Sequence, residues 1–281
     1  MNSRYSFEFF PPKSNASHLA LDTCLHDLAS WKPEFCSMTY GAGGSSQVES
    51  YTAIQRLQKL GHVPAAHITA VGASKAEVDQ AAQAFIEAGI DHLVALRGDG
   101  PNGQFVSHPQ GYKYGADLVA GLRRWFEGTI SVAGYPETHP EATSAKADLT
   151  HLKTKVEAGA NQIMTQYCYD TDSLLRFADQ LQAQAVDVPI IVGIMPIHDI
   201  QAVQRFSARC GATVPDTIVA QFENLSDTSD QFNLAIDIAL TQIEQLANHG
   251  LNQVHLYTLN RPLWVQGILQ EMAQPKLAKS A

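Results

Sequence analysis

The sequence is short of positive charge and of long apolar runs, and both shortages exclude classes of function. Its 281 residues carry 19 lysines and arginines against 28 aspartates and glutamates, a formal net charge of −9, and no segment gathers the basic residues. The resulting field repels a polyphosphate backbone, so nucleic acid is not an expected partner. No stretch reaches the roughly 20 apolar residues that cross a bilayer, and MNSRYSFEFF has no apolar signal core. We therefore expect no membrane association and a cytoplasmic location.

Clustered cysteines are also missing. Cys24, Cys36, Cys168 and Cys210 lie far apart and form no CxxC pair, so we expect small reduced core residues. His67 and His139 have no HxxxH partner and no carboxylate at ligand spacing, so no metal site is expected.

What the sequence does have is a repeated alternation of short β-branched or aromatic runs with longer segments of helical apolar spacing. Serines open several of the expected helices, which are 17–30, 46–60, 74–88 and 144–157. The expected strands are 5–10, 35–40, 65–70, 92–97, 130–135, 162–167, 190–195 and 253–257. Eight strand–helix units fit a closed parallel barrel better than an open doubly wound sheet.

No Gly/Ser-rich linker or shift in composition divides the chain, so we expect residues 1–281 to form a single α/β domain, a (β/α)8 TIM barrel. The segment 202–249 is long enough for extra helical structure between the seventh and eighth strands.

Catalytic groups of such barrels come from the carboxyl ends of the strands, and seven of the expected ends are polar here. Alternation puts Ser6, Glu8 and Phe10 on one face of the first strand, so Glu8 either enters the barrel mouth or lies against the helices. Surrounded by aromatic residues, an inward carboxylate would lose hydration and its pKa should rise, as a general acid requires. An ordinary salt-bridged glutamate is the alternative.

Two further positions carry charge at this end. The Arg97-Gly98-Asp99 loop presents a guanidinium suited to phosphate, a glycine that permits close approach of a flat ligand, and a carboxylate that can accept from ring NH groups. On the expected helix 144–157, Asp148, His151 and Lys155 fall on one face. That face could hold a ribose and pyrophosphate, or it could be an ordinary charged outer surface.

Taken in order, several motifs resemble the methylenetetrahydrofolate reductase family. They are SFEFFPPK (6–13), SMTYGAGG (37–44), HIT (67–69), ALRGD (95–99), YPETHPEA (135–142), KADLTHLKTKVEAGANQIMTQ (146–166), VGIMPI (192–197) and HLYTLNR (255–261). They span nearly the whole chain in the family's order, so the resemblance is specific.

The resemblance implies reduction of 5,10-methylenetetrahydrofolate to 5-methyltetrahydrofolate, in one-carbon metabolism and methionine supply. FAD at the barrel mouth would carry the electrons, reduced in turn by NADH or NADPH. By this resemblance Glu8 is the acid that protonates N5 of the folate, and Asp99 is the second catalytic residue, close to flavin and pterin.

The resemblance also implies binding residues. Thr39 matches a position on the nicotinamide and substrate side. The folate positions are Asp99, Gln166, Gln221, Phe222, Tyr257 and Arg261, of which Arg261 suits a folate carboxylate. The flavin positions are Tyr40, Ala42, His67, Arg97, Gly98, Asp99, Tyr114, Tyr135, His139, Asp148, His151 and Lys155. Two positions depart from the family pattern: His151 stands where the family has asparagine, and Thr154 where a basic residue is common.

Because of these departures, a reductase of the same fold that needs no flavin stays open as an alternative. A folate-linked methyltransferase barrel is a second, although the clustered zinc ligands of its thiol-activating members are missing. A barrel without catalytic activity is a third, and the presence of Glu8 and Asp99 argues against it. By resemblance we expect a homo-oligomer of the short bacterial kind, without the regulatory domain of the eukaryotic enzymes or inhibition by S-adenosylmethionine.

Overall fold

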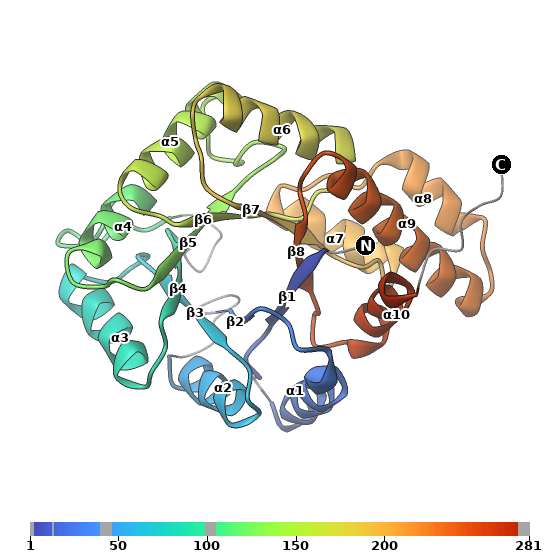
Figure 1. Cartoon of the computed structure of the whole chain (residues 1–281), viewed down its shortest axis with the longest axis horizontal. Coiled ribbons are helices and arrows are strands. Elements are labelled where there is room, and N and C mark those ends of the chain that lie inside the picture. The colour runs from blue at the N-terminus through green and yellow to red at the C-terminus, as the bar shows by residue number, and fades with distance from the viewer. Residues whose placement is uncertain (1–2, 13, 40–46, 99–104, 275–281) are drawn as a thin grey trace.

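The computed structural model describes residues 3–12, 14–39, 47–98 and 105–274. Eight parallel strands follow one another in chain order, and β8 pairs with β1 to close the barrel, so the first and last strands lie side by side (Figure 1). The strands are β1 (Arg4–Phe9), β2 (Cys36–Met38), β3 (Pro64–Thr69), β4 (His92–Leu96), β5 (Thr129–Gly134), β6 (Gln162–Thr165), β7 (Ile190–Ile194) and β8 (Gln253–Tyr257). The expected barrel and its eight strands are confirmed.

Helices cover the outside of the barrel (Figure 1). They are α1 (Asn15–Leu28), the short η1 (Ala29–Trp31), α2 (Gln47–Lys59), α3 (Lys75–Glu87), α4 (Gly115–Arg123), α5 (Ala145–Glu157), α6 (Thr171–Ala183), α7 (Ile200–Cys210), α8 (Asp216–Glu223), α9 (Thr228–Asn248) and α10 (Pro262–Ala273). Three of them, α7, α8 and α9, stand between β7 and β8, which confirms the extra helical structure expected there.

Serine caps explain where several helices begin. Ser74 accepts from the Glu77 amide in a complete capping box, and Ser144 accepts from the Ala147 amide. The expected start of the first helix at Ser17 is wrong, because Ser14 is the N-cap and Ser17 is its capping-box partner in the first turn. Ser46 lies outside the described residues.

Strand alternation separates two cores. Phe7 and Phe9 of β1 are buried among the apolar faces of the surrounding helices. The opposite faces of the strands supply a smaller apolar cluster inside the barrel, made of Phe35, Ala65, Val94, Met164 and Ile191. Residues that share the inner face, including Glu8, therefore stand in a barrel filled with side chains.

Two further findings concern the described residues alone. No helix among them is both long and apolar enough to cross a membrane. Their four cysteines are free thiols, of which Cys24, Cys36 and Cys168 are buried.

Candidate active site

Glu8 projects into the barrel. Its Oε2 lies 3.2 Å from the Ser37 hydroxyl, 3.4 Å from His255 Nε2 and 3.5 Å from His67 Nε2. These three partners come from β2, β8 and β3, so the inward alternative for Glu8 is confirmed. The side chain is 9% exposed, which leaves the carboxylate in contact with solvent only at one edge.

The expected rise of the Glu8 pKa is wrong. Burial raises the pKa, but a hydrogen bond to His255, the charges of His67 and His255, and a hydrogen bond from Ser37 together bring it below the ordinary value. The sequence around Glu8 indicates the loss of hydration but not the polar partners, which three other strands supply. The site as folded therefore favours the carboxylate.

Ser37 and His255 are functional neighbours that residue-by-residue reasoning missed. Both lie in motifs quoted above, two positions before Thr39 and Tyr257 respectively. Because inner-face residues recur every second position, a polar residue at the strand end predicts that the residue two earlier also points inward. That periodicity is the signal that could have found them.

Two buried polar atoms on β3 and just after β2 make no hydrogen bond with the described residues, although His67 Nε2 lies 3.5 Å from the Glu8 carboxylate. Thr39 Oγ1 and His67 Nε2 have almost no exposed area and make no hydrogen bond with the part of the chain that the structure describes. Unsatisfied buried groups cost free energy, so two of them on β3 and just after the neighbouring strand β2 indicate a ligand position. Burial lowers the His67 pKa, so this ring is poised to act as a neutral hydrogen-bonding group.

At the next strand end, Arg97 forms an ion pair with Glu141 and stacks over the Phe105 ring, 4.8 Å from its centre. Gly98 has φ +82, and a Cβ there would stand 2.8 Å from Val71 Cγ1. The glycine is therefore required by its backbone conformation and by packing against the preceding loop, in addition to the ligand approach expected from sequence.

Lys155 brings a second positive charge to this side. Its Nζ donates to the Ala133 carbonyl at 2.6 Å, at the end of β5. Burial lowers the pKa of Lys155 to about 8, the Asp148 carboxylate opposes this shift, and the Arg97 guanidinium adds to it. The effect of Arg97 places the two cations within electrostatic reach of one another, an arrangement that suits an anion such as a diphosphate.

Tyr135, His139 and Asp148 lie together beside these cations. The rings of Tyr135 and His139 meet edge to face, with centroids 4.5 Å apart. Asp148 Oδ2 accepts from the His139 amide at 2.9 Å. The first turn of α5 is thereby tied to the loop after β5.

Tyr114 and His151 occupy the outer edge of this group. Tyr114 is 66% exposed and immediately precedes α4, and a Cβ on the adjacent Gly115 would stand 3.1 Å from Lys155 Cδ. His151 is exposed on α5, one turn from the half-buried Lys155. Of the predicted face of α5, Asp148 and Lys155 turn toward the barrel end, whereas His151 faces solvent.

The expected folate residues form a second group. Tyr257 donates its hydroxyl to the Thr165 carbonyl at 3.1 Å and meets the His255 ring edge to face, 5.4 Å between centroids. Gln166 follows β6, where its Oε1 accepts from the Tyr167 amide. Arg261 is exposed directly before α10. The three residues lie at the same end of the barrel as Glu8.

The pair Gln221 and Phe222 lies on α8 rather than on a strand or the loop directly after one. Gln221 is exposed and donates to Thr217 of its own helix at 3.0 Å. Phe222 is buried in a cluster with Tyr167 and Met195, against which Tyr257 also packs. In this state Phe222 supports the wall behind Tyr257, and the folate contact of the pair stays a prediction.

Three predicted residues, Tyr40, Ala42 and Asp99, lie outside the described residues. Among the residues that are described, no group of three or more histidine, cysteine or acidic side chains could hold a metal ion.

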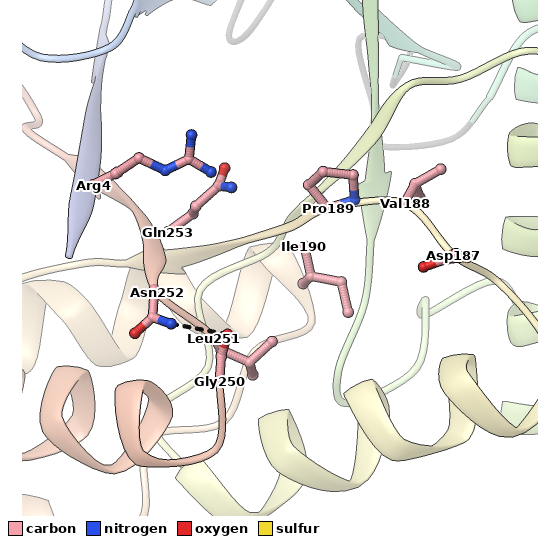
Figure 2. Close-up of a pocket in the computed structure, with 9 residues that line it drawn as sticks. All are labelled: Arg4, Asp187, Val188, Pro189, Ile190, Gly250, Leu251, Asn252 and Gln253. Carbon is pink, nitrogen blue, oxygen red and sulfur yellow. Dashed lines mark hydrogen bonds between the residues drawn. The ribbon is translucent and has the colours of Figure 1, made fainter. Parts of the chain in front are cut away.

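A cavity of about 420 Å³ lies at the opposite end of the barrel, where β1, β7 and β8 begin (Figure 2). Its lining residues are Arg4, Asp187, Val188, Pro189, Ile190, Gly250, Leu251, Asn252 and Gln253. These residues precede or open their strands, so the cavity does not belong to the site at the carboxyl ends.

Comparison with known proteins gives the family. A family model described as methylenetetrahydrofolate reductase matches residues 1–273. A 5,10-methylenetetrahydrofolate reductase of Pectobacterium carotovorum is 39% identical over 91% of this chain and 85% of the relative. The protein of that name from Escherichia coli K12 is 38% identical over 91% of this chain and 86% of the relative. A methylenetetrahydrofolate reductase (NADH) of Arabidopsis thaliana is 34% identical over 98% of this chain and 50% of the relative.

Solved structures support the fold. An uncharacterized protein from Clostridium thermocellum, described as binding two copies of 5-methyl-5,6,7,8-tetrahydrofolic acid, superposes with a TM-score of 0.68 over 95% of this chain and 93% of that chain, at 12% identity. At this identity the likeness concerns the barrel alone. The match of the family model and the identity to the bacterial relatives go further: the chain belongs to the methylenetetrahydrofolate reductase family.

Proposed function

We propose that the chain reduces 5,10-methylenetetrahydrofolate to 5-methyltetrahydrofolate with electrons from NADH or NADPH, through FAD bound at the carboxyl ends of the strands. The reductase activity follows from the family. The observation that supports the finer proposal is the inward Glu8 carboxylate, which lies at the end of the barrel where Thr39 Oγ1 and His67 Nε2 make no hydrogen bond with the described residues. A buried acid beside unsatisfied polar groups is suited to proton transfer to a bound ligand.

The residues present fit FAD. Thr39 and His67 offer unsatisfied polar atoms, and Arg97 and Lys155 offer paired positive charge for its diphosphate. The residues that would hold it are His67, Arg97, Gly98, Tyr114, Tyr135, His139, Asp148, His151 and Lys155, together with Tyr40, Ala42 and Asp99 outside the described residues. When bound, FAD would supply the hydride chemistry that connects the nicotinamide to the one-carbon unit of the folate.

Glu8 performs the acid step in this proposal. Because the product keeps its carbon bonded to N5, the bond from this carbon to N10 must break, so the acid serves N10 rather than the N5 expected from the resemblance. The Glu8 O–H bond breaks as an N–H bond forms on N10, the C–N10 bond breaks to open the five-membered ring, and the one-carbon unit on N5 becomes electrophilic. Gln166 and Tyr257 would bind the pterin side, Asp99 would assist there, and Arg261 would pair with a folate carboxylate at the solvent edge. Thr39 would contact the nicotinamide and substrate side. The binding of 5-methyltetrahydrofolic acid by the Clostridium thermocellum barrel supports a folate site in a barrel of this shape.

An anaerobic experiment on the purified protein separates the two half-reactions. NADH or NADPH should bleach the flavin absorbance, and 5,10-methylenetetrahydrofolate should then restore it while 5-methyltetrahydrofolate forms. Colourless protein that still oxidises NADH with methylenetetrahydrofolate would support the flavin-independent alternative, which the exposed His151 and Thr154 keep open. Bleached flavin that the folate cannot restore would contradict the proposed reaction.

We also propose that the chain acts as a single catalytic barrel in a homo-oligomer in the cytoplasm. The described residues form one closed barrel, and the oligomer is an expectation from the family resemblance. Sedimentation equilibrium of the purified protein tests it, and a monomer at micromolar concentration would contradict it.

A further inference from the structure

His255 is a wholly buried histidine on the inner face of β8, and the reaction as proposed so far does not use it. Its relative exposure is 0%, and it faces Ser6 and Glu8 of β1 and Ser37 of β2. The Phe35 ring stacks on it with centroids 5.6 Å apart, so an apolar surface covers one face of the imidazole. A polar ring kept at this depth needs every one of its hydrogen-bonding atoms satisfied.

Ser6 is the hydrogen-bond partner of one ring nitrogen of His255, Nδ1. Ser6 Oγ lies 2.7 Å from His255 Nδ1 and 3.4 Å from the Val254 carbonyl. With the Ser6 hydroxyl donating to this carbonyl, which can only accept, the Ser6 oxygen accepts from His255 Nδ1–H. The neutral form of His255 therefore has its bare nitrogen, Nε2, turned toward Glu8.

Glu8 and His255 Nε2 consequently need a proton between them. Nε2 lies 3.4 Å from Glu8 Oε2, and Ser37 Oγ lies 3.1 Å from Nε2 and 3.2 Å from the same carboxylate oxygen. Ser37 has one proton and can satisfy only one of these two acceptors. With a bare nitrogen and an ionised carboxylate, one lone pair would face another in a poorly hydrated interior, whereas one added proton satisfies both atoms.

We propose that Glu8 and His255 hold one proton as a pair, and that His255 is the positioning residue that returns this proton to Glu8 for transfer to the folate nitrogen. This inference rests on the proposed function. In the resting state His255 Nε2–H faces the Glu8 carboxylate. As substrate reacts, the Nε2–H bond breaks and the Glu8 O–H bond forms, then that O–H bond breaks as the folate N–H bond forms. The neutral imidazole and the carboxylate are reset by one proton from solvent at the barrel mouth.

Other titratable groups face this pair. His67 of β3 lies 3.5 Å from Glu8, and the charge of the Glu8 carboxylate contributes to the raised pKa of Tyr257 of β8, after burial. His92 of β4 interacts electrostatically with His255 but forms its own hydrogen bond to Ser131 at 2.7 Å. Burial lowers the pKa of His92 to about 3, so this histidine stays neutral and offers a matched control in the same barrel interior.

The first test needs neither flavin nor turnover. Side-chain ¹⁵N NMR of the full-length protein, with the His255 signals identified by their loss in His255→Gln, reports which nitrogen carries a proton. We expect protons on both Nδ1 and Nε2 in the unmodified protein and the loss of the Nε2 proton in Glu8→Gln at the same pH, because the amide no longer stabilises the imidazolium. A proton on Nε2 alone in the unmodified protein, or an Nε2 proton that persists in Glu8→Gln, would overturn the shared proton.

The second test measures both half-reactions against pH in His255→Gln and His92→Gln. Glutamine at position 255 cannot carry the proton, so flavin reduction by nicotinamide should stay within about twofold. The rate of folate reduction should fall at least about tenfold and its pH profile should change. General acid catalysis commonly supplies a rate enhancement of about 10²–10⁴-fold, of which this loss is a part. His92→Gln should keep the profile of the unmodified protein. Ser6→Ala removes the hydrogen bond to His255 Nδ1 with little loss of volume, so it should show the same defect more weakly. This variant replaces His255→Gln in the test if His255→Gln does not fold.

The outcomes separate this inference from the proposed function. If the unmodified protein does not reduce the folate, the proposed function fails, and the NMR measurement still decides whether the proton is shared. If it reduces the folate and both His255→Gln and Ser6→Ala match its rate and pH profile, the role of His255 is overturned.

Discussion

Asn260 binds both backbone polar groups of Phe10. Its Oδ1 accepts from the Phe10 amide at 3.0 Å, and its Nδ2 donates to the Phe10 carbonyl at 2.9 Å. Thr258, two residues earlier, donates its hydroxyl to the Glu8 carbonyl at 2.6 Å. The turn after the last strand thus fixes the end of the first strand, where the proposed acid is positioned.

Replacing Asn260 tests this attachment. Asn260→Ala removes both hydrogen bonds and puts alanine at φ +54, so the free energy of unfolding should fall by about 2–4 kcal/mol. Asn260→Gly loses the same bonds but tolerates the backbone, and should be about 1 kcal/mol less destabilised. Urea unfolding measures both, and an alanine variant as stable as the unmodified protein would contradict the attachment.

Gly98 and Gly72 offer a comparison of crowding at similar backbone angles. A Cβ at Gly98 would stand 2.8 Å from Val71 Cγ1 and 2.9 Å from Thr69 Cβ, whereas Gly72 has nothing within 4 Å. Gly98→Ala should therefore cost about 1–3 kcal/mol more than Gly72→Ala and displace the neighbouring Arg97, with loss of bound flavin. Thermal unfolding and the flavin-to-protein absorbance ratio measure these effects, and equal behaviour of the two variants would count against the crowding argument.

The buried ammonium group of Lys155 should lower the free energy of unfolding at neutral pH. The folded state lowers the pKa of Lys155 to about 8 from an ordinary 10.5, so the unfolded chain binds more protons between these values. The stability contributed by this residue is therefore lowest below pH 8 and rises as the pH increases from about 8 to 10.5. Lys155→Met should raise the melting temperature of the flavin-free protein at pH 7 by about 2–4 °C and should abolish this rise with pH.

The same substitution should weaken flavin binding. Without the ammonium, the dissociation constant for FAD should increase about tenfold or more at pH 7, and the affinity should no longer fall as the pH passes about 8. Fluorescence titration of flavin-free protein with FAD measures this. A variant that binds FAD as tightly as the unmodified protein at pH 7 would remove Lys155 from the proposed diphosphate site.

The fold was predictable because its signals repeat. Each strand–helix unit has its own apolar period and several have a serine cap, so an error such as starting the first helix at Ser17 moved one boundary and changed nothing else. The inward direction of Glu8 followed from alternation along β1, once the other face was assigned to Phe7 and Phe9.

The electrostatics of the site were not predictable in the same way. The pKa of Glu8 depends on Ser37, His67 and His255, which come from three different strands and meet only when the barrel closes. The aromatic residues next to Glu8 in the sequence suggested a raised pKa. In the closed barrel, side chains of neighbouring strands form hydrogen bonds to the carboxylate that lower this pKa. The same limit applies to His151, whose exposure on α5 depends on how that helix packs.

The central claim is that Glu8 supplies the proton for folate reduction, and stopped-flow measurement of the two half-reactions in Glu8→Gln tests it most directly. Glutamine keeps the size and most hydrogen bonds of the side chain but cannot donate an acidic proton. Flavin bleaching by the nicotinamide should stay within about twofold of the unmodified protein, while reoxidation by methylenetetrahydrofolate should slow by about 10²–10⁴. Equal loss in both half-reactions, or reoxidation at an unchanged rate, would contradict the account.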